Sequence, residues 1–424
     1  SANTVFTIRT DAVTPTQLAV GPGTVRTNAW TDGRTVLWGV GAALNQLSLV
    51  TCTEPFASPC APLQTALPSG PWGGTAVSAF IPQVGTIATS LVTDSPAPFT
   101  PILSTLGPDG GITQLRPVAA GNAAAPTIQA GKMVYVDTLG GGRNVVELVD
   151  FARDRPVDGE AVGASTPGIS GNLVAWLDPR FSATGAVDVI TSNLTTGRVL
   201  RQTSSSALRG QLSFDYPWLV WVEEVGPGCV GVPCVRFLNL VSGASGKVGN
   251  SNCSTALPFN FCAPRVWGQR VAWADFRGAN PDVYLYDLVS SVESVVANSA
   301  NPEGSPWLSG DRVVWRETRS GVDQRIQSRH YGPTAGCPAT ECVAGPAASG
   351  CRFIGGPITR ENPSVSAPAG VPCGAKVAWE EGATDTTRIG VFDWARGGGR
   401  GPAAGGRAAR HDPPAERQRP GRDK

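Results

Sequence analysis

The sequence has little histidine, methionine or lysine. His330 and His411 are the only histidines and Met133 is the only methionine among 424 residues. Because acid–base, nucleophilic and zinc chemistry commonly use histidine, this scarcity excludes most histidine-dependent catalysis. No run of about 20 apolar residues occurs, so no membrane-spanning helix is predicted. The formal net charge is only +1, which favours neither a nucleic-acid binder nor an acidic disordered chain.

Turn-forming residues are abundant instead. The chain contains 52 Gly and 36 Pro, about a fifth of all residues, against roughly 12% in average usage. Charged residues make up 16% and hydrophobic residues 41%, so a large core can be buried. This composition predicts a turn-rich, all-β globular protein.

Ten cysteines fall into five close pairs, which are Cys52/Cys60, Cys229/Cys234, Cys253/Cys262, Cys337/Cys342 and Cys351/Cys373. Zinc sites are the alternative, but they favour tighter cysteine spacings or nearby histidines. The pairs therefore predict disulfides, with more than one pairing open among the last four cysteines. Disulfides indicate an oxidising compartment, and the start at Ser1 is that expected of a mature chain after removal of a signal peptide. A secreted, periplasmic or cell-surface protein is predicted.

The most informative pattern is a repeat of four short alternating segments separated by turn residues. Its best copy covers residues 263–267, 270–275, 282–288 and 292–296. Such a unit is typical of a four-stranded antiparallel meander, whose strands we call A to D. An aromatic residue marks each B strand, and the set is Trp38, Tyr135, Trp176, Trp221, Trp273, Trp315 and Trp379. We interpret these aromatic side chains as core wedges between units.

From Tyr135 onward the steps between these aromatics are 41, 45, 52, 42 and 64 residues. The gap of 97 residues between Trp38 and Tyr135 leaves room for one degenerate unit, with its B strand near residues 85–93. A period near 40 to 45 residues made of four strands is typical of propeller blades. We predict eight blades, with seven as the alternative.

A family resemblance is found in four segments, namely Ser170-Gly171-Asn172, Ser309-Gly310-Asp311, Asp275-Phe276-Arg277 and residues 282–288. They resemble the TolB-type, WD-like propeller repeat of bacterial exported proteins. The resemblance is strongest over residues 165–330. It implies a β-propeller and protein–protein contact at the cell envelope or surface, but the repeat serves many activities and does not identify one.

The ends of the chain differ from its middle. The last unit has A to C segments up to residue 393 and then lacks a D strand, whereas residues 5–9 and 16–20 are spare N-terminal strands. One of these is predicted to close the ring, which removes exposed strand edges. Residues 1–394 are thus predicted to form one propeller domain. Residues 395–424 carry a local net charge of +5 with many Gly, Pro and Arg, and are predicted to be a disordered basic tail.

An acid follows the B-strand aromatic by two residues in six units, at Asp137, Asp178, Glu223, Asp275, Glu317 and Glu381. Three of these acids are followed two residues later by Arg180, Arg277 and Arg319. Period-two geometry places each aromatic and its acid on one face of the strand. In one interpretation the acids cap their own B–C loops or pair with these arginines. In the other they line a binding site at the axial mouth, where Asp137, Glu223 and Glu381, which lack such an arginine, would need a cation such as calcium (Ca2+).

The insertions indicate which face carries function. Cys229/Cys234 lies in a B–C loop, whereas Cys253/Cys262 and residues 330–361 lie in D–A connections. These two classes of loop emerge on the same side of a four-stranded blade, and Cys52/Cys60 falls in a C–D loop on the other side. Disulfide-pinned loops lose little entropy on binding and suit a recognition face. Resistance to proteolysis is the alternative explanation.

Catalysis finds little support in the residues. No Gly-x-Ser-x-Gly or His-Glu-x-x-His segment occurs. We therefore predict an exported binding or scaffold propeller that recognises a protein or glycan partner and is not an enzyme. The alternatives are a carboxylate-dependent polysaccharide hydrolase or lyase, and a structural cell-surface or filament subunit that self-assembles.

Overall fold

The fold is seen in a computed structural model of the chain. It describes the strands between Thr4 and Asp393, and it describes side chains within residues 127, 132–139, 144–148, 156–157, 163–181, 186–204, 207–224, 226, 228–253, 262–319 and 324–331. The tail predicted for residues 395–424 lies outside the described residues. None of the described residues belongs to a helix long and apolar enough to span a membrane.

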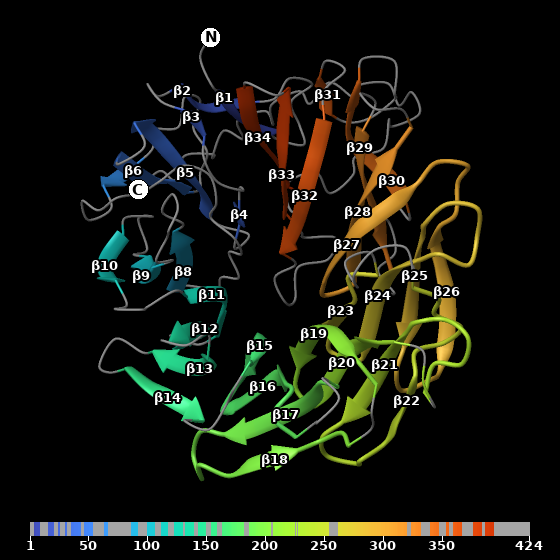
Figure 1. Cartoon of the computed structure of the whole chain (residues 1–424). Coiled ribbons are helices and arrows are strands. Elements are labelled where there is room, and N and C mark those ends of the chain that lie inside the picture. The colour runs from blue at the N-terminus through green and yellow to red at the C-terminus, as the bar shows by residue number, and fades with distance from the viewer. Residues whose placement is uncertain are drawn as a thin grey trace, which may run out of the picture.

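The described strands form eight sheets, arranged around a common centre (Figure 1). Four of them are four-stranded antiparallel meanders in chain order. The first two consist of β11 (Ala123–Gln129), β12 (Lys132–Leu139), β13 (Arg143–Val149) and β14 (Asp154–Asp158), and of β15 (Ser165–Ser170), β16 (Leu173–Asp178), β17 (Asp188–Asn193) and β18 (Val199–Arg201). The next two consist of β19 (Arg209–Asp215), β20 (Trp218–Glu223), β21 (Cys234–Asn239) and β22 (Ser245–Lys247), and of β23 (Arg265–Trp267), β24 (Arg270–Asp275), β25 (Asp282–Asp287) and β26 (Val292–Ala297).

Three further sheets vary this plan. One sheet adds a parallel fifth strand to β27 (Glu303–Ser309), β28 (Arg312–Thr318), β29 (Gln324–His330) and β30 (Thr340–Pro346), namely β31 (Phe353–Gly355). Another contains β3 (Thr24–Val25), β4 (Trp30–Thr31), β5 (Thr35–Ala43), β6 (Gln46–Thr53) and β7 (Leu63–Ala66). The third contains β8 (Thr86–Leu91), β9 (Thr100–Leu106) and β10 (Ile112–Pro117). Strand β8 lies where the B strand of the degenerate unit was expected.

The eighth sheet joins the two ends of the chain. It contains β32 (Thr359–Ser366), β33 (Lys376–Ala383) and β34 (Thr386–Asp393), followed by β1 (Thr4–Ile8) and β2 (Thr16–Val20). Strand β1 pairs in parallel with β34, with Val5 opposite Ile389. The prediction that an N-terminal strand completes the last unit is therefore confirmed. The all-β architecture of antiparallel sheets is confirmed as well, whereas the number of blades remains a prediction of eight, with seven as the alternative.

Short polar signals in the sequence set the turns. Gly171, Gly268 and Gly310 occupy the A–B turns with φ of 61°, 56° and 56°, a region that favours glycine. The C–D turns begin with Asn193, Asn239 and Asp287, and the Oδ1 of each accepts two backbone N–H groups from the residues that follow. These side chains satisfy the turn backbone, which explains why Asn or Asp ends the third strand in these units.

Four A segments share an irregularity in the backbone. Thr166, Gln211, Ala263 and Ser305 have positive φ, between 39° and 51°. Each of them lies ten residues before a B-strand tryptophan. The pairing register of β15, β19 and β27 shifts by one residue at this place, which marks a β-bulge.

The repeated tryptophans fill the core between neighbouring sheets. Trp176 and Trp273 are fully buried, and Trp221 and Trp315 are 3% exposed. Trp221 packs with Ala175, Leu177 and Val189 of the preceding sheet, and Trp315 packs in the same way with residues of β24 and β25. The interpretation of these residues as core wedges is confirmed for the four tryptophans, while the side chains of Trp38 and Trp379 lie outside the described residues.

Truncation of one wedge tests this packing. Trp273→Ala should lower the free energy of unfolding by about 4 kcal/mol, because it removes a large buried side chain and leaves a cavity between two sheets. Trp267→Ala, six residues earlier and 49% exposed, is the matched control and should cost less than about 1 kcal/mol. Urea denaturation of both variants measures the difference. Equal losses would contradict the assignment of Trp273 to the inter-sheet core.

Candidate functional site

The acids that follow the tryptophans lie on the same strand face as the indole rings. Trp176 Nε1 donates a hydrogen bond to Asp178 Oδ2 at 3.1 Å, and Trp273 Nε1 donates to Asp275 Oδ2 at 2.7 Å. In the same way Trp221 Nε1 donates to Glu223 Oε2 at 3.3 Å. The alternation of side chains along the B strand thus brings aromatic and acid together as predicted.

Three of the acids also hold the arginine two residues farther along. Asp178 accepts the backbone N–H of Arg180 at 2.9 Å and its Nε–H at 2.9 Å. Asp275 accepts the N–H of Arg277 at 2.9 Å and pairs with its guanidinium at 2.7 Å. Glu317 pairs with Arg319 at 2.8 Å. These contacts are those expected if the acids fix their own B–C hairpins, and the three carboxylates are only 0% to 4% exposed.

Glu223 has partners that the sequence interpretation did not foresee. Its Oε2 accepts a hydrogen bond from Arg209 Nε at 3.0 Å, and its Oε1 lies 3.9 Å from Arg236 Nε. The expectation that Glu223 lacks an arginine is therefore wrong. The reason is that Arg209 begins β19 directly opposite Glu223 in the register, although it lies 14 residues earlier in the chain.

Two further acids, Asp137 and Glu381, also lack a following arginine. Asp137 lies in β12, is 6% exposed and has interaction partners of its own. The backbone of Glu381 belongs to β33, but its side chain lies outside the described residues. Among the residues that the structure describes, no three His, Cys, Asp or Glu side chains gather as a metal site would require. The described acids therefore offer no cluster for calcium.

Residues on the neighbouring sheet complete the charge pairs. Arg209 is buried and also reaches Asp188 of β17 at 3.3 Å. Asp188 in turn pairs with Arg201 at 2.7 Å. Because Arg209 bonds Glu223 within its own sheet and Asp188 in the preceding one, it links two sheets through charge-assisted hydrogen bonds.

Glu303 occupies the position in its sheet that Arg209 occupies two sheets earlier, but it is an acid and not a base. Arg209 and Glu303 each lie twelve residues before the B-strand tryptophan and opposite the acid of that strand. The sequence analysis did not identify either residue, because the same offset carries Ala164 and Phe261 in the units of Trp176 and Trp273 and therefore shows no repeated pattern. Burial raises the pKa of Glu303 to about 7, and the nearby charges of Asp282 and Glu317 contribute, against hydrogen bonds from Ser299 that lower it. Burial also raises the pKa of Asp282, beside Glu303.

Two disulfides pin adjoining loops along one edge of these sheets. The Cα atoms of Cys229 and Cys234 are 5.5 Å apart, and those of Cys253 and Cys262 are 5.4 Å apart. The first closes the β20–β21 loop and the second the β22–β23 connection, as the sequence predicted. The other cysteines, Cys52, Cys60, Cys337, Cys342, Cys351 and Cys373, have side chains outside the described residues.

Backbone hydrogen bonds connect these two loops to each other and to the next sheet. Cys253 N–H donates to Pro233 O at 2.8 Å. Asn252 N–H donates to Asp275 Oδ2 at 3.0 Å, and its carbonyl accepts the N–H of Phe276 at 2.8 Å. The connection from β22 to β23 is therefore hydrogen-bonded to the β20–β21 loop through Cys253 and to the next sheet through Asn252. We call these two disulfide-closed segments, residues 229–234 and 253–262, the stapled loops.

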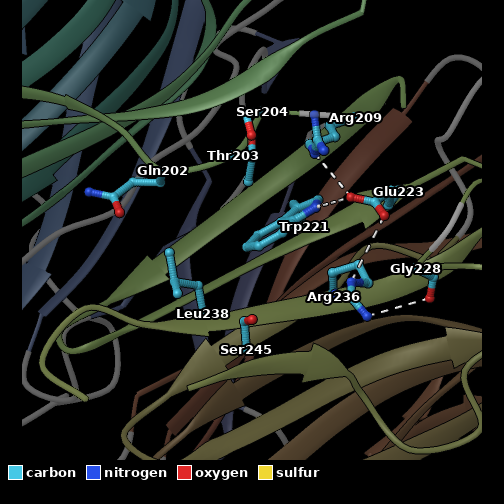
Figure 2. Close-up of a pocket in the computed structure, with 10 residues that line it drawn as sticks. All are labelled: Gln202, Thr203, Ser204, Arg209, Trp221, Glu223, Gly228, Arg236, Leu238 and Ser245. Atoms are coloured by element: carbon cyan, nitrogen blue, oxygen red, sulfur yellow. Dashed lines mark hydrogen bonds and ion pairs between the residues drawn. The ribbon is translucent and has the colours of Figure 1, made fainter. Parts of the chain in front are cut away.

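A cavity lies beside the loop closed by Cys229 and Cys234, between the sheet of β15–β18 and the sheet of β19–β22 (Figure 2). Its volume is about 270 Å³. The lining consists of Gln202, Thr203, Ser204, Arg209, Trp221, Glu223, Gly228, Arg236, Leu238 and Ser245. Gly228 lies against the Glu223–Arg236 pair so closely that a Cβ there would meet Glu223 Oε1 at 2.5 Å. The B–C loop thus covers one side of this ion pair because residue 228 has no side chain.

Comparison with known proteins supports the fold and not an activity. No family model matches the chain, and no curated protein matches it. Among solved structures, the β-propeller domain of the Trilobed protease from Pyrococcus furiosus is similar with a TM-score of 0.50 and 8% identity, over 76% of this chain and 98% of that one. A structure from a study of two prolyl endopeptidases is similar with a TM-score of 0.51 and 10% identity, over 89% of this chain and 62% of that one.

TolB from Acinetobacter baumannii is also among the similar structures, with a TM-score of 0.39 and 16% identity, over 69% of this chain and 76% of that one. Together, the radial arrangement of sheets and the likeness to the Trilobed protease domain confirm the predicted β-propeller fold.

The raised pKa of Glu303 predicts how stability varies with pH. Glu303→Gln cannot ionise, so at pH 8 it should be more stable than the wild type by on the order of 2 kcal/mol. In the wild type the unfolded state ionises first as pH rises from 4.5 towards 7, so the native state binds more protons and stability falls over this range. The gain from the variant should therefore vanish near pH 4.5. Urea midpoints measured from pH 4.5 to 8.5 give the comparison.

Glu293→Gln is a control of opposite sign, because Glu293 pairs with Arg277 at 2.6 Å. This variant should be less stable than the wild type at pH 8. A gain for Glu303→Gln that stays constant across the pH range would show that the carboxyl of Glu303 is not held protonated by its surroundings.

Proposed function

We propose that the chain is an exported, non-catalytic binding or scaffold propeller that recognises a protein or glycan partner through the face carrying the stapled loops. The observation that supports this most is the continuity of that face. The Cys229–Cys234 loop, the Cys253–Cys262 connection and the β24–β25 loop are linked by hydrogen bonds through Asn252 and Cys253. A loop held in this way before binding, as residues 229–234 are, loses little conformational entropy when a partner docks.

An exposed apolar residue sits within the first stapled loop. Val230 is 85% exposed, although Cys229 and Cys234 at either end of the loop are fully buried. The disulfide thus presents a valine to solvent at a fixed position. A contact residue of this kind, on a short rigid loop, suits recognition of a partner surface.

The charged groups beside this face support a binding role over a catalytic one. Asp178, Asp275 and Glu317 are each engaged by an arginine and are almost fully buried. A general acid or base must reach substrate, and these buried or arginine-paired groups are instead committed to the fold.

The disulfides support an oxidising location. Both of them close loops between strands that also belong to the core, as is common in secreted, periplasmic and surface proteins. The proposal therefore covers a partner at the cell surface or envelope, and the partner is a protein or a glycan. Self-assembly through this face is a form of the same proposal, with a second copy as the partner.

Two valines on opposite edges provide a matched test. Val230→Asp should weaken partner binding at least tenfold, because a charge would be placed in the docking contact. Val241→Asp should leave binding unchanged, since Val241 is 69% exposed in the turn between β21 and β22, at the other edge of the same sheet. Labelled wild type and both variants are compared on a glycan array and on extract from the envelope of the producing cell. Equal binding by both variants would contradict the proposed face.

Catalysis is tested separately with the wild type and Glu223→Gln. Neither should turn over any member of a panel of polysaccharides, as judged by release of reducing ends and of unsaturated products. Turnover by the wild type that is lost in Glu223→Gln would overturn the non-catalytic proposal in favour of a carboxylate-dependent hydrolase or lyase.

A further inference from the structure

The cavity beside the loop closed by Cys229 and Cys234 is small and carries several polar side chains in its lining. Its volume of about 270 Å³ is just below the range of roughly 300–1,000 Å³ that holds drug-sized molecules. It therefore suits a single small ring or a short hydroxy acid. Strands β20 and β21 supply one wall, and Gln202, Thr203 and Ser204, which follow β18, supply the other (Figure 2). Rigid strands on one side and a short connection on the other make a preformed site.

A series of ion pairs runs alongside the cavity, with charges that alternate in sign, and its last member is an arginine. In order of contact they are Arg201, Asp188, Arg209, Glu223 and Arg236. Three positive and two negative groups leave an excess of one positive charge. The successive distances of 2.7, 3.3 and 3.0 Å show tight pairing up to Glu223, whereas the last contact, to Arg236, is 3.9 Å. An anion placed against Arg236 would continue the alternation and neutralise the excess.

Arg236 is the least satisfied member of the series. A guanidinium offers five N–H donors, and the described contacts of Arg236 comprise one long hydrogen bond, from Nη1 to Gly228 O at 3.4 Å, and the 3.9 Å ion pair. Its Nε is buried without a hydrogen-bond partner, and the side chain as a whole is 21% exposed. A guanidinium edge that retains donors and faces a cavity can bind a carboxylate in a bidentate manner.

The remaining lining selects for hydroxyl groups. Ser204 and Ser245 place hydroxyls at the cavity, and Gln202 donates through Nε2 to Thr191 Oγ1 at 2.7 Å, which leaves its carbonyl oxygen as an acceptor. We infer that this cavity binds a small hydroxylated carboxylate, such as the acidic sugar unit of a glycan, with its carboxylate on Arg236 and its hydroxyls on the serines and Gln202. This deepens the proposed function and rests on it only in making a glycan the partner.

The test uses a pair of sugars that differ only in the acid group, sodium D-glucuronate and D-glucose, titrated into the wild-type chain and followed by ligand-observed NMR and calorimetry. Glucuronate should bind saturably, and at least tenfold more tightly than glucose, because a charge-assisted bidentate contact is lost with glucose. Acetate should compete at least tenfold less well than glucuronate, because it lacks the hydroxyls. If glucuronate does not bind saturably, or if the two sugars bind equally well, the inference is overturned. If acetate competes as well as glucuronate, the role assigned to the hydroxyl groups is overturned.

Variants locate the site. Arg236→Gln should weaken glucuronate binding at least tenfold, and Arg198→Gln, an exposed arginine in the turn between β17 and β18 that does not line the cavity, should leave it unchanged. Ser245→Tyr, on the exposed outer strand, should block the cavity without touching the charge series, which keeps the test valid if Arg236→Gln unfolds. Binding that survives Ser245→Tyr would place the sugar elsewhere and refute the assignment.

The outcome is separable from that of the proposed function. If glucuronate fails to bind while Val230→Asp still abolishes partner binding, the cavity inference is wrong and the recognition face remains. If glucuronate binds while Val230→Asp and Val241→Asp behave alike, the cavity inference holds and the proposed face is wrong.

Discussion

The hydrogen bond from an indole N–H to the carboxylate two residues farther along the same strand connects the core with the loops in three of the described sheets. The indole ring fills the space against the preceding sheet, so its position is fixed by packing. Its N–H then fixes the acid, and the acid fixes the backbone and guanidinium at the start of the following loop. Because Asp275 also receives the N–H of Asn252, the same carboxylate orders the connection arriving from the neighbouring sheet. Loop order on this edge therefore depends on core packing.

Buried carboxylates at the junctions between sheets require compensating charge, and the chain meets this requirement in two ways. Arg209 bridges Asp188 and Glu223 across one junction. At the equivalent place another junction has Glu303, which faces Asp282 and Glu317 and is compensated by a raised pKa. One backbone plan thus accommodates an arginine bridge or a carboxyl with a raised pKa, depending on a single residue. The first arrangement keeps a cation next to the cavity, so of these two junctions it is the candidate for anion binding.

Much of the fold followed from the sequence because its signals are local. The period of the tryptophans, the glycine in the A–B turn and the Asn or Asp at the start of the C–D turn each act within a few residues of their position. The pairs of Asp178, Asp275 and Glu317 with arginines two residues on were predictable for the same reason. Arg209 was not, since it meets Glu223 only through the register of β19 with β20.

That register contains the bulge at Gln211, and a one-residue shift turns every side chain beyond it to the other face of the strand. Alternation alone therefore gives the wrong face for Arg209, and likewise for Glu303 beyond the bulge at Ser305. Asp188 belongs to another sheet altogether, so no spacing within one repeat relates it to Glu223. The cavity beside them depends on contacts between repeats and could not be predicted from any single copy.

The parallel pairing of β1 with β34 also determines how the molecule bears load. The N-terminal end of β1 and the C-terminal end of β34 point in opposite directions along the paired strands. Tension applied through the two chain ends would therefore slide one strand along the other. Four residue pairs, from Val5 and Ile389 to Ile8 and Phe392, would resist together, whereas a peeling force would break their hydrogen bonds one after another. The two ends of the chain are thus joined in the pairing geometry that resists tension more strongly.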